Sequence, residues 1–174
     1  DSIIYAPAEF DSVAGLIFAW EAYSTLLTEL IKEVAEDDTA WVVVDNTSEE
    51  NSVSNTLSNA NVNMDHVVFQ VIATNSVWIR DYGPWWVIEP ENSRAIIDLV
   101  YNRPRPQDDA YPELAAVDFG VNYYGLGLIE AGGNMLLDGQ GAVILSNVIF
   151  DGSQGIDPNL TQEQLEQYFL DYFG

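Results

Sequence analysis

The sequence contains no cysteine, so the chain forms no disulfide bond and offers no thiol nucleophile. Positive charge is also scarce: lysine and arginine number 5 against 28 aspartates and glutamates, which gives a formal net charge of -23. Phosphate binding depends on basic patches, so this composition argues against nucleic acid as a partner. It argues equally against an anionic membrane surface.

No hydrophobic run is long enough to span a membrane, and no initiator methionine or signal peptide precedes Asp1. We therefore expect that a leader was removed or that the sequence was trimmed, and that the protein is secreted or at the cell surface rather than cytoplasmic. The acidic surface keeps the protein soluble or is an adaptation to salt, which screens self-repulsion. Lys32 is the single lysine, which favours a saline or marine habitat.

The 174 residues are enough for one domain with a core, and 48% of them are hydrophobic. Apolar and β-branched runs predict strands at 2–5, 13–20, 41–44, 67–73, 85–88, 95–101, 126–130, 135–137 and 142–146. Helical spacing and capping signals predict helices at 23–35, 48–60, 110–121 and 161–173, with Ser48 and Thr161 at two of the starts. A loop is expected at 78–84, and an extended path is expected across "NRPRPQDD" because proline restricts the backbone.

The strands and helices alternate in a loose ββαβ rhythm, which predicts an α/β fold with apolar strands covered by helices. No linker or low-complexity segment divides the chain.

Arginine is concentrated in two unusual segments, "WIRDYGPWW" and "NRPRPQDD". Of the four arginines, only Arg94 lies outside them; Arg80, Arg103 and Arg105 lie within. A single arginine in so acidic a chain is explained by a surface ion pair. Three arginines within two such segments favour recognition of an anion or a carboxylate. The planar guanidinium group suits this role because it binds a carboxylate through two parallel hydrogen bonds.

Asp81 has two interpretations. An aspartate before Gly-Pro is often only a turn former. Alternatively, its carboxylate meets a flat cation that stacks on the indole of Trp78, since an aromatic face beside a carboxylate suits a guanidinium group. Trp85 and Trp86 point to opposite faces of a strand, so at least one of them is expected in the core.

Four segments in this order, "APAEF", "WIRDYGPWW", "YNRPRPQDD" and "GGNMLLDGQG", resemble the agmatine deiminase and bacterial (Porphyromonas-type) peptidylarginine deiminase family. The resemblance runs from Pro7 to the closing helix, and "YNRPRP" resembles the peptidylarginine branch. In "EAGGN" a residue separates the glutamate from the glycine pair, unlike in the agmatine enzymes. The resemblance implies the pentein fold, an α/β-propeller of ββαβ modules, with residues 1–174 as the N-terminal part of one such domain. Roughly half the modules are present, so the ring is incomplete and we expect a complementary C-terminal chain or self-association.

The resemblance also implies a mechanism without metal or cofactor. A cysteine thiolate attacks the guanidinium carbon, carboxylates hold the guanidinium nitrogens, a histidine protonates the departing ammonia, and water releases citrulline or carbamoylputrescine. Asp81 would be the first carboxylate and Trp78 would line the pocket. Arg103 and Arg105 would grip the terminal carboxylate of a peptide ending in arginine.

The catalytic cysteine, histidine and second aspartate of the family lie beyond the point where this chain stops, and His66 does not match the catalytic position. Without a nucleophile the covalent route is closed, so the isolated chain is expected to be inactive. Two alternatives stay open: a non-catalytic module that binds arginine-containing peptides or self-assembles, and a plain scaffold. Whether the acidic stretches "DGQG" and "DDAYPE" bind calcium weakly also stays open.

Overall fold

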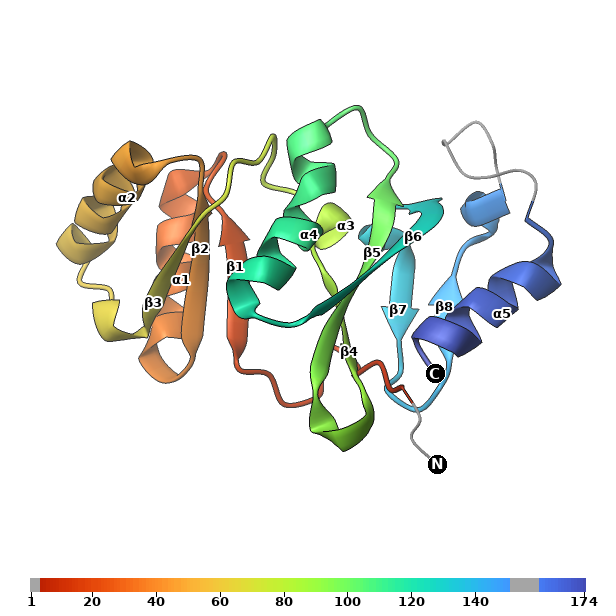
Figure 1. Cartoon of the computed structure of the whole chain (residues 1–174). Coiled ribbons are helices and arrows are strands. Elements are labelled where there is room, and N and C mark those ends of the chain that lie inside the picture. Colours follow the sequence, from red (N-terminus) through yellow and green to blue (C-terminus); the bar gives the residue numbers. More distant parts are fainter. Residues whose placement is uncertain (1–3, 151–159) are drawn as a thin grey trace. The chain divides into compact units, whose positions relative to one another are not determined.

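The computed structural model describes residues 4–150 and 160–174, and it divides into two compact units (Figure 1). Unit 1 consists of Asp1–Asp11, Arg80–Arg105 and Pro112–Gly174; unit 2 consists of Ser12–Ile79 and Pro106–Tyr111. Strands and helices alternate in both, which confirms the predicted α/β class. Within the described ranges, no helix has the length and apolar character needed to cross a membrane.

Unit 2 is a parallel three-stranded sheet with helical connections. The order is β1-β2-β3, formed by β1 (Gly15–Ala19), β2 (Thr39–Val44) and β3 (Val67–Val71). Parallel neighbours need crossover connections, and α1 (Ser24–Asp37), then α2 (Thr47–Asn59) with the short η1 (Met64–His66), provide them. The helices bury Leu27, Ile31, Val53 and Leu57 against Val42 and Val44 of the central strand.

Two local details in unit 2 refine the predictions. The predicted start of the second helix at Ser48 is wrong by one residue, because Asn46 is the cap. Its side-chain oxygen accepts from the backbone N–H groups of Ser48 (3.0 Å) and Glu49 (3.1 Å), which leaves Thr47 as the first helical residue. His66 lies in η1, with its Nδ1 2.9 Å from the carbonyl oxygen of Ala35 near the end of α1.

Unit 1 contains one complete ββαβ module followed by a hairpin and a helix. In the module, β4 (Trp85–Ile88) pairs antiparallel with β5 (Arg94–Tyr101), and β5 pairs parallel with β6 (Asn122–Glu130). The chain passes from β5 to β6 through α4 (Pro106–Phe119), of which the part from Pro112 onward belongs to unit 1. The remaining elements are β7 (Met135–Leu137) paired antiparallel with β8 (Val143–Leu145), the helix α5 (Gln162–Tyr172), and the short η2 (Pro90–Asn92), η3 (Gly132–Asn134) and η4 (Asn147–Phe150).

One apolar core holds unit 1 together. The inner faces of the sheets meet the buried stripe of α5; the buried residues are Ala6, Val87, Ala95, Ile97, Leu99, Leu126, Leu128, Met135, Ile149, Leu165, Phe169 and Phe173. The predicted cap of α5 is confirmed as a reciprocal pair, because Thr161 accepts from the Gln164 N–H and the Gln164 side chain accepts from the Thr161 N–H. Trp85 packs against this core, and Trp86 packs edge-on against Phe119. Both tryptophans are half-buried and have packing roles.

Two predicted elements begin too late, since α4 begins at Pro106 rather than at 110 and β6 begins at Asn122 rather than at 126. Three further segments differ from the structure in kind. The expected loop at 78–84 contains one helical turn, α3 (Ile79–Tyr82). The extended path expected through "NRPRPQDD" ends at Arg105, because Pro106 occupies the first helical turn, where it needs no N–H partner, and two aspartates follow it there. Of the expected strand at 2–5, Tyr5 forms a single bridge to Ile88, and residues 2–3 lie outside the described range.

Candidate functional site

Asp81 lies on the single turn α3 and is half-buried. Its Oδ1 accepts a hydrogen bond from the backbone N–H of Gly133, at 3.2 Å, in the short helix η3. Hydrogen bonds to an ionised acceptor are stronger than bonds between neutral groups, so the bond from Gly133 fixes the direction of the Asp81 carboxylate. The first carboxylate predicted from the sequence is therefore tied to the "GGN" segment, which follows it by about fifty residues.

The glycine pair makes this approach possible. A Cβ atom added to Gly132 would lie 2.3 Å from the carbonyl oxygen of Arg80, and one added to Gly133 would lie 2.5 Å from Oδ1 of Asp81. Both distances are shorter than atoms tolerate, and the first contact is with backbone, which moves less readily than a side chain. Glycine is therefore required at position 132, where η3 packs on the backbone of α3, whereas a side chain at position 133 would displace the Asp81 carboxylate.

Gly132→Ala is expected to destabilise unit 1 by about 1–3 kcal/mol, as overpacking does in tight interiors. Thermal or urea unfolding of the chain measures the loss. Gly127→Ala is the matched control, because no atom lies within 4 Å of a Cβ at that position on β6. Equal stability of the two variants would contradict the steric argument.

Arg80 has a structural role in this packing. Its Nη2 donates to the carbonyl oxygen of Met135 at 2.8 Å and forms an ion pair with Glu9, while the guanidinium lies 4.9 Å from the centre of the Trp85 ring. Three of the unusual sequence segments thus meet at one side chain: "APAEF", "WIRDYGPWW" and "GGNMLLDGQG". For Arg80 the ion-pair interpretation describes the observed contacts, and its guanidinium already has a carboxylate partner.

Glu130, at the end of β6, was not selected from the sequence. It is 1% exposed. Its Oε1 accepts from the Ala131 N–H (2.8 Å) and from the side-chain amide of Asn134 (3.3 Å), while its buried Oε2 has no hydrogen-bond partner among the described residues. Burial raises the pKa of the Glu130 carboxyl, although both hydrogen bonds oppose the shift. The only sequence signal was a glutamate that closes an apolar strand.

Asp81 and Glu130 both bond to the short helix η3, since Asp81 accepts from Gly133 and Glu130 accepts from Asn134. A buried carboxyl with a raised pKa is a feature found at catalytic and cation-binding sites. The pair identifies the η3 turn as the centre of the candidate site.

The raised pKa of Glu130 predicts a pH dependence of stability. An acid whose folded pKa lies above its ordinary value of 4.5 contributes full stability below that value and loses it as pH rises through the folded pKa. Glu130→Gln removes this loss, so the variant's free energy of unfolding should rise relative to the unchanged chain between acidic and neutral pH. Urea titrations of the variant and the unchanged chain at several pH values measure the difference in their free energies of unfolding. Burial also raises the pKa of Glu21, but this effect is the same in both chains and cancels in the difference. A difference that stays constant with pH would contradict the prediction.

Arg105 is connected to the same region through two tyrosines of unit 1. Its Nη1 donates to the hydroxyl of Tyr101 at 3.3 Å, and the Tyr101 ring packs 5.7 Å from the ring of Tyr82, the neighbour of Asp81. Tyr101 also lies opposite Glu130 in the β5–β6 register. Arg103 is exposed, and its carbonyl oxygen accepts from the Arg105 N–H at 2.8 Å.

Trp78 belongs to unit 2 and is 52% exposed. The loop before it is anchored by Asp108, a fully buried residue of "NRPRPQDD". Its carboxylate accepts from the N–H groups of Asn75 (2.6 Å) and Ser76 (3.1 Å) and from the Ser76 hydroxyl (2.6 Å). The segment "NRPRPQDD" is thus hydrogen-bonded to the loop just before Trp78. It stays a prediction that one cleft contains Trp78, Asp81, Arg103 and Arg105.

One carboxylate in each of the acidic stretches named as calcium candidates accepts hydrogen bonds from the chain itself. Oδ1 of Asp138, in "DGQG", accepts from the N–H groups of Gln140 (2.8 Å) and Ala142 (2.9 Å), which lowers the pKa of Asp138. Asp108 of "DDAYPE" is engaged as described above. In residues 4–150 and 160–174, no cluster of three or more His, Cys, Asp or Glu has a metal-binding arrangement.

Comparison with known proteins agrees with these motifs. The sequence model of the Porphyromonas-type peptidyl-arginine deiminase family matches residues 6–174. A Selenomonas ruminantium protein that bears a provisional agmatine deiminase name is 28% identical, over 98% of this chain and 51% of its own length. A similarly named Legionella pneumophila protein is 26% identical, over 94% of this chain and 46% of its own. The chain spans about half the length of the curated relatives that it matches.

Solved structures show the same fold. The agmatine deiminase of Enterococcus faecalis superposes with a TM-score of 0.82 at 22% identity, over 98% of this chain and 50% of that protein. The agmatine deiminase of C. jejuni gives 0.76 at 20% identity, over 99% and 53%. These likenesses confirm the predicted pentein fold and confirm that the chain corresponds to about half of it.

Proposed function

Because the chain belongs to the Porphyromonas-type peptidyl-arginine deiminase family, we propose that it forms the substrate-holding first half of a guanidino deiminase. The complete enzyme hydrolyses a guanidinium group: one C–N bond breaks, water supplies the oxygen of the ureido product, and the departing nitrogen leaves as ammonia. The cysteine and histidine for this reaction come from the part of the fold that this chain does not span. The chain's own task is to bind and orient the substrate.

The observation that carries the proposal is the fixed carboxylate of Asp81. Gly133 occupies Oδ1, which directs Oδ2 to a substrate N–H group. Glu130 offers a second, buried carboxyl oxygen at the same turn. A cation held by carboxylates in a poorly solvated site gains far more than it would in water, and guanidinium has N–H groups for both.

Arg103 and Arg105 support a substrate that ends in a carboxylate. Tyr101 holds the Arg105 side chain, and a peptide ending in arginine presents its carboxylate a short distance from its guanidinium. We therefore propose peptidyl-arginine as the substrate, with agmatine or free arginine as the alternative. The net charge of -23 attracts any of these cations over a distance.

The proposal includes a partner and a location. The complementary half of the fold, or a second copy of this chain, covers what the chain leaves open, and the protein acts outside the cytoplasm. A second candidate function is a non-catalytic module that binds arginine-containing peptides, for which the fixed carboxylate of Asp81 would serve equally well.

The isolated 174-residue chain should release no ureido product from agmatine, arginine or an arginine-ended peptide, because it has no thiol nucleophile. A colorimetric ureido assay measures this, with the complete enzyme as the positive control. Turnover by the isolated chain would overturn the proposed mechanism. An inactive complete enzyme that still binds the peptide would favour the binding module instead.

A further inference from the structure

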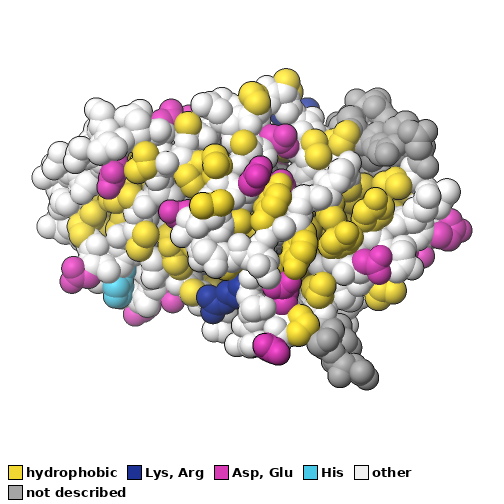
Figure 2. All heavy atoms as spheres, in the orientation of Figure 1, with side chains coloured by type: hydrophobic (Ala, Val, Ile, Leu, Met, Phe, Trp, Pro, Cys, Tyr) yellow, Lys and Arg dark blue, Asp and Glu magenta, His cyan; other side chains and the backbone are white. Residues whose placement is uncertain are grey.

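A row of three tyrosine rings lies on the surface of unit 1, on β6 and α5. The rings of Tyr168 and Tyr172, one turn apart on α5, stack with their centroids 6.2 Å apart and their planes inclined by 20°. The Tyr124 ring of β6 continues the row, with its centroid 6.5 Å from that of Tyr172. Tyr124 and Tyr168, at the two ends, are 37% and 38% exposed. Hydrophobic side chains, among which Figure 2 counts tyrosine, gather beside α5 with acidic side chains around them.

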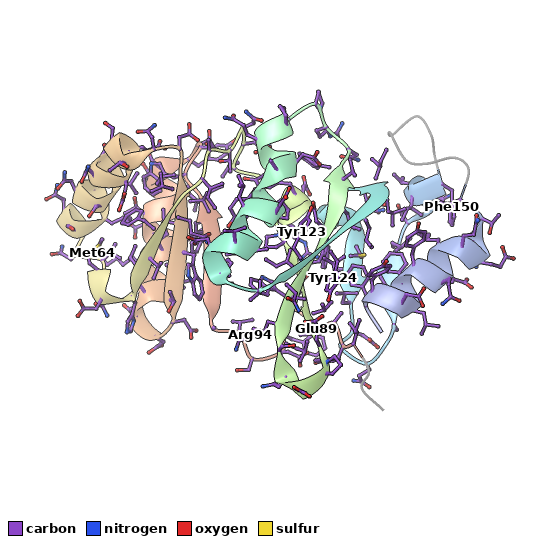
Figure 3. The ribbon with its side chains drawn as sticks, in the orientation of Figure 1. Met64, Glu89, Arg94, Tyr123, Tyr124 and Phe150 are labelled. Atoms are coloured by element: carbon purple, nitrogen blue, oxygen red, sulfur yellow. The ribbon has the colours of Figure 1, made fainter. Side chains whose placement is uncertain are left out.

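The carboxylate of Glu89 lies at the Tyr124 end of this row (Figure 3). Its Oε1 accepts from the Tyr124 hydroxyl at 2.6 Å, and its Oε2 accepts from the side-chain amide of Asn122 at 2.8 Å and from the Ser93 hydroxyl at 3.2 Å. These bonds, the one from Tyr124 most of all, lower the pKa of Glu89, so the group is an anion at neutral pH. All three donors are neutral. Glu89 forms no ion pair with the residues that the structure describes, Arg94 included.

An open ring face beside an unpaired carboxylate suits a flat cation. The face of an aromatic ring is negative and attracts a cation, more often arginine than lysine. A guanidinium group stacks on such a face and keeps its in-plane N–H groups for a carboxylate. Tyr124 contributes to both contacts, because a phenol that donates to an anion is polarised and its ring becomes more negative. A neutral ligand would leave the charge of Glu89 without a partner.

We propose that the tyrosine row and Glu89 bind an arginine side chain of a polypeptide substrate, separate from the arginine whose guanidinium group is hydrolysed. The identity of this ligand rests on the proposed function, which makes arginine-containing peptides the substrates. The inference therefore deepens that function by naming a second contact for the same substrate class.

The length of β6 sets which substrates use this contact. Tyr124 lies about six residues before Glu130 on this strand, which is roughly 20 Å at the rise of an extended chain. A peptide whose last residue is in the candidate site therefore reaches the tyrosine row only with an arginine several residues before its C-terminus. Agmatine and free arginine are too short to occupy both places. The tyrosine row thus favours polypeptides with a second arginine over small guanidino compounds.

NMR of the tyrosine rings tests the proposal on the 174-residue chain, without turnover. The chain, with its tyrosine rings labelled with ¹³C, is titrated with an acetylated and amidated Gly-Arg-Gly-Arg-Gly peptide, which has no terminal carboxylate. The ring signals of Tyr124, Tyr168 and Tyr172 should shift until the site is saturated. The same peptide with citrulline in place of each arginine should bind at least about tenfold more weakly, because it keeps the shape and loses the charge.

Two variants and two matched controls locate the binding. Glu89→Gln removes the carboxylate charge and Tyr168→Leu removes one ring, and each should weaken binding of the arginine peptide at least about threefold. Glu33→Gln removes an exposed charge from α1, and Phe10→Leu removes a ring that is 78% exposed. Neither control should change the affinity.

Unchanged tyrosine signals, equal binding of the citrulline peptide, or equal losses in the two controls would overturn the proposal. The titration is repeated on the Asp81→Asn chain, in which the affinity should stay the same. Loss of the tyrosine shifts in that variant would place the peptide at the candidate site and would overturn the inference as well. Failure of the deiminase proposal would be seen in turnover, which this measurement does not involve.

Discussion

Asp81→Asn should abolish turnover of every guanidino substrate by the complete enzyme, lowering kcat/KM by roughly 10³-fold or more. The asparagine side chain keeps an oxygen for the Gly133 N–H, so the packing of α3 on η3 is preserved. What is lost is the negative charge that offsets a cation in a poorly solvated site, and a neutral amide does not replace it. Agmatine, free arginine and an arginine-ended peptide should suffer alike, since all carry the guanidinium.

Asp37→Asn is the matched control, because it removes the same charge from an exposed position at the end of α1. Its kcat/KM should equal that of the unchanged enzyme. Both variants should also retain the melting temperature. If Asp81→Asn kept more than a tenth of the activity, or lost activity only through unfolding, Asp81 would not be the guanidinium carboxylate.

Arg103→Ala combined with Arg105→Ala should impair only substrates with a terminal carboxylate. Each lost charged contact costs about 1.5–3 kcal/mol, so the peptide should lose roughly two to four powers of ten in kcat/KM. Agmatine has no carboxylate and should be nearly unaffected. Measuring both substrates on one preparation separates recognition from stability.

Arg94→Ala provides the comparison for charge alone, because Arg94 is an exposed cation at the start of β5. It should leave both substrates unchanged. Equal losses for agmatine and the peptide in the double variant would show that the arginine pair does not read a carboxylate.

The sequence predicted element type well wherever one residue pattern dominates. The β-branched runs at 41–44 and 85–88 and the capped helix after Thr161 form as expected, because burial and capping act locally there. The predictions at "WIRDYGP" and "RPQDD" were wrong where local signals compete. Gly-Pro and repeated prolines signal breaks, yet α3 forms one turn and Pro106 begins a helix, which proline permits only at that position.

The candidate site was partly visible in the sequence. Asp81 stood out because arginine and tryptophan surround it in an acidic chain. Glu130 did not, since a glutamate is ordinary in such a composition, and its importance arises from burial and from Asn134 and Ala131. Neither this burial nor these contacts can be predicted from the spacing of residues in the sequence. The sequence predicts a turn at Gly132-Gly133, whereas the contacts show that η3 approaches α3 closely at this glycine pair.

The discontinuity of unit 1 has a consequence for synthesis on the ribosome. Unit 2 is nearly continuous, with Ser12–Ile79 supplying all three of its strands. Unit 1 instead joins the first residues of the chain to its last ones, and the Ala6 N–H donates to the carbonyl oxygen of Phe173 at 3.1 Å. Domains generally fold as units while the chain emerges. We therefore expect unit 2 to assemble once Pro106–Tyr111 has emerged, and the segment with Glu9 to complete its packing in unit 1 only after α5 has emerged.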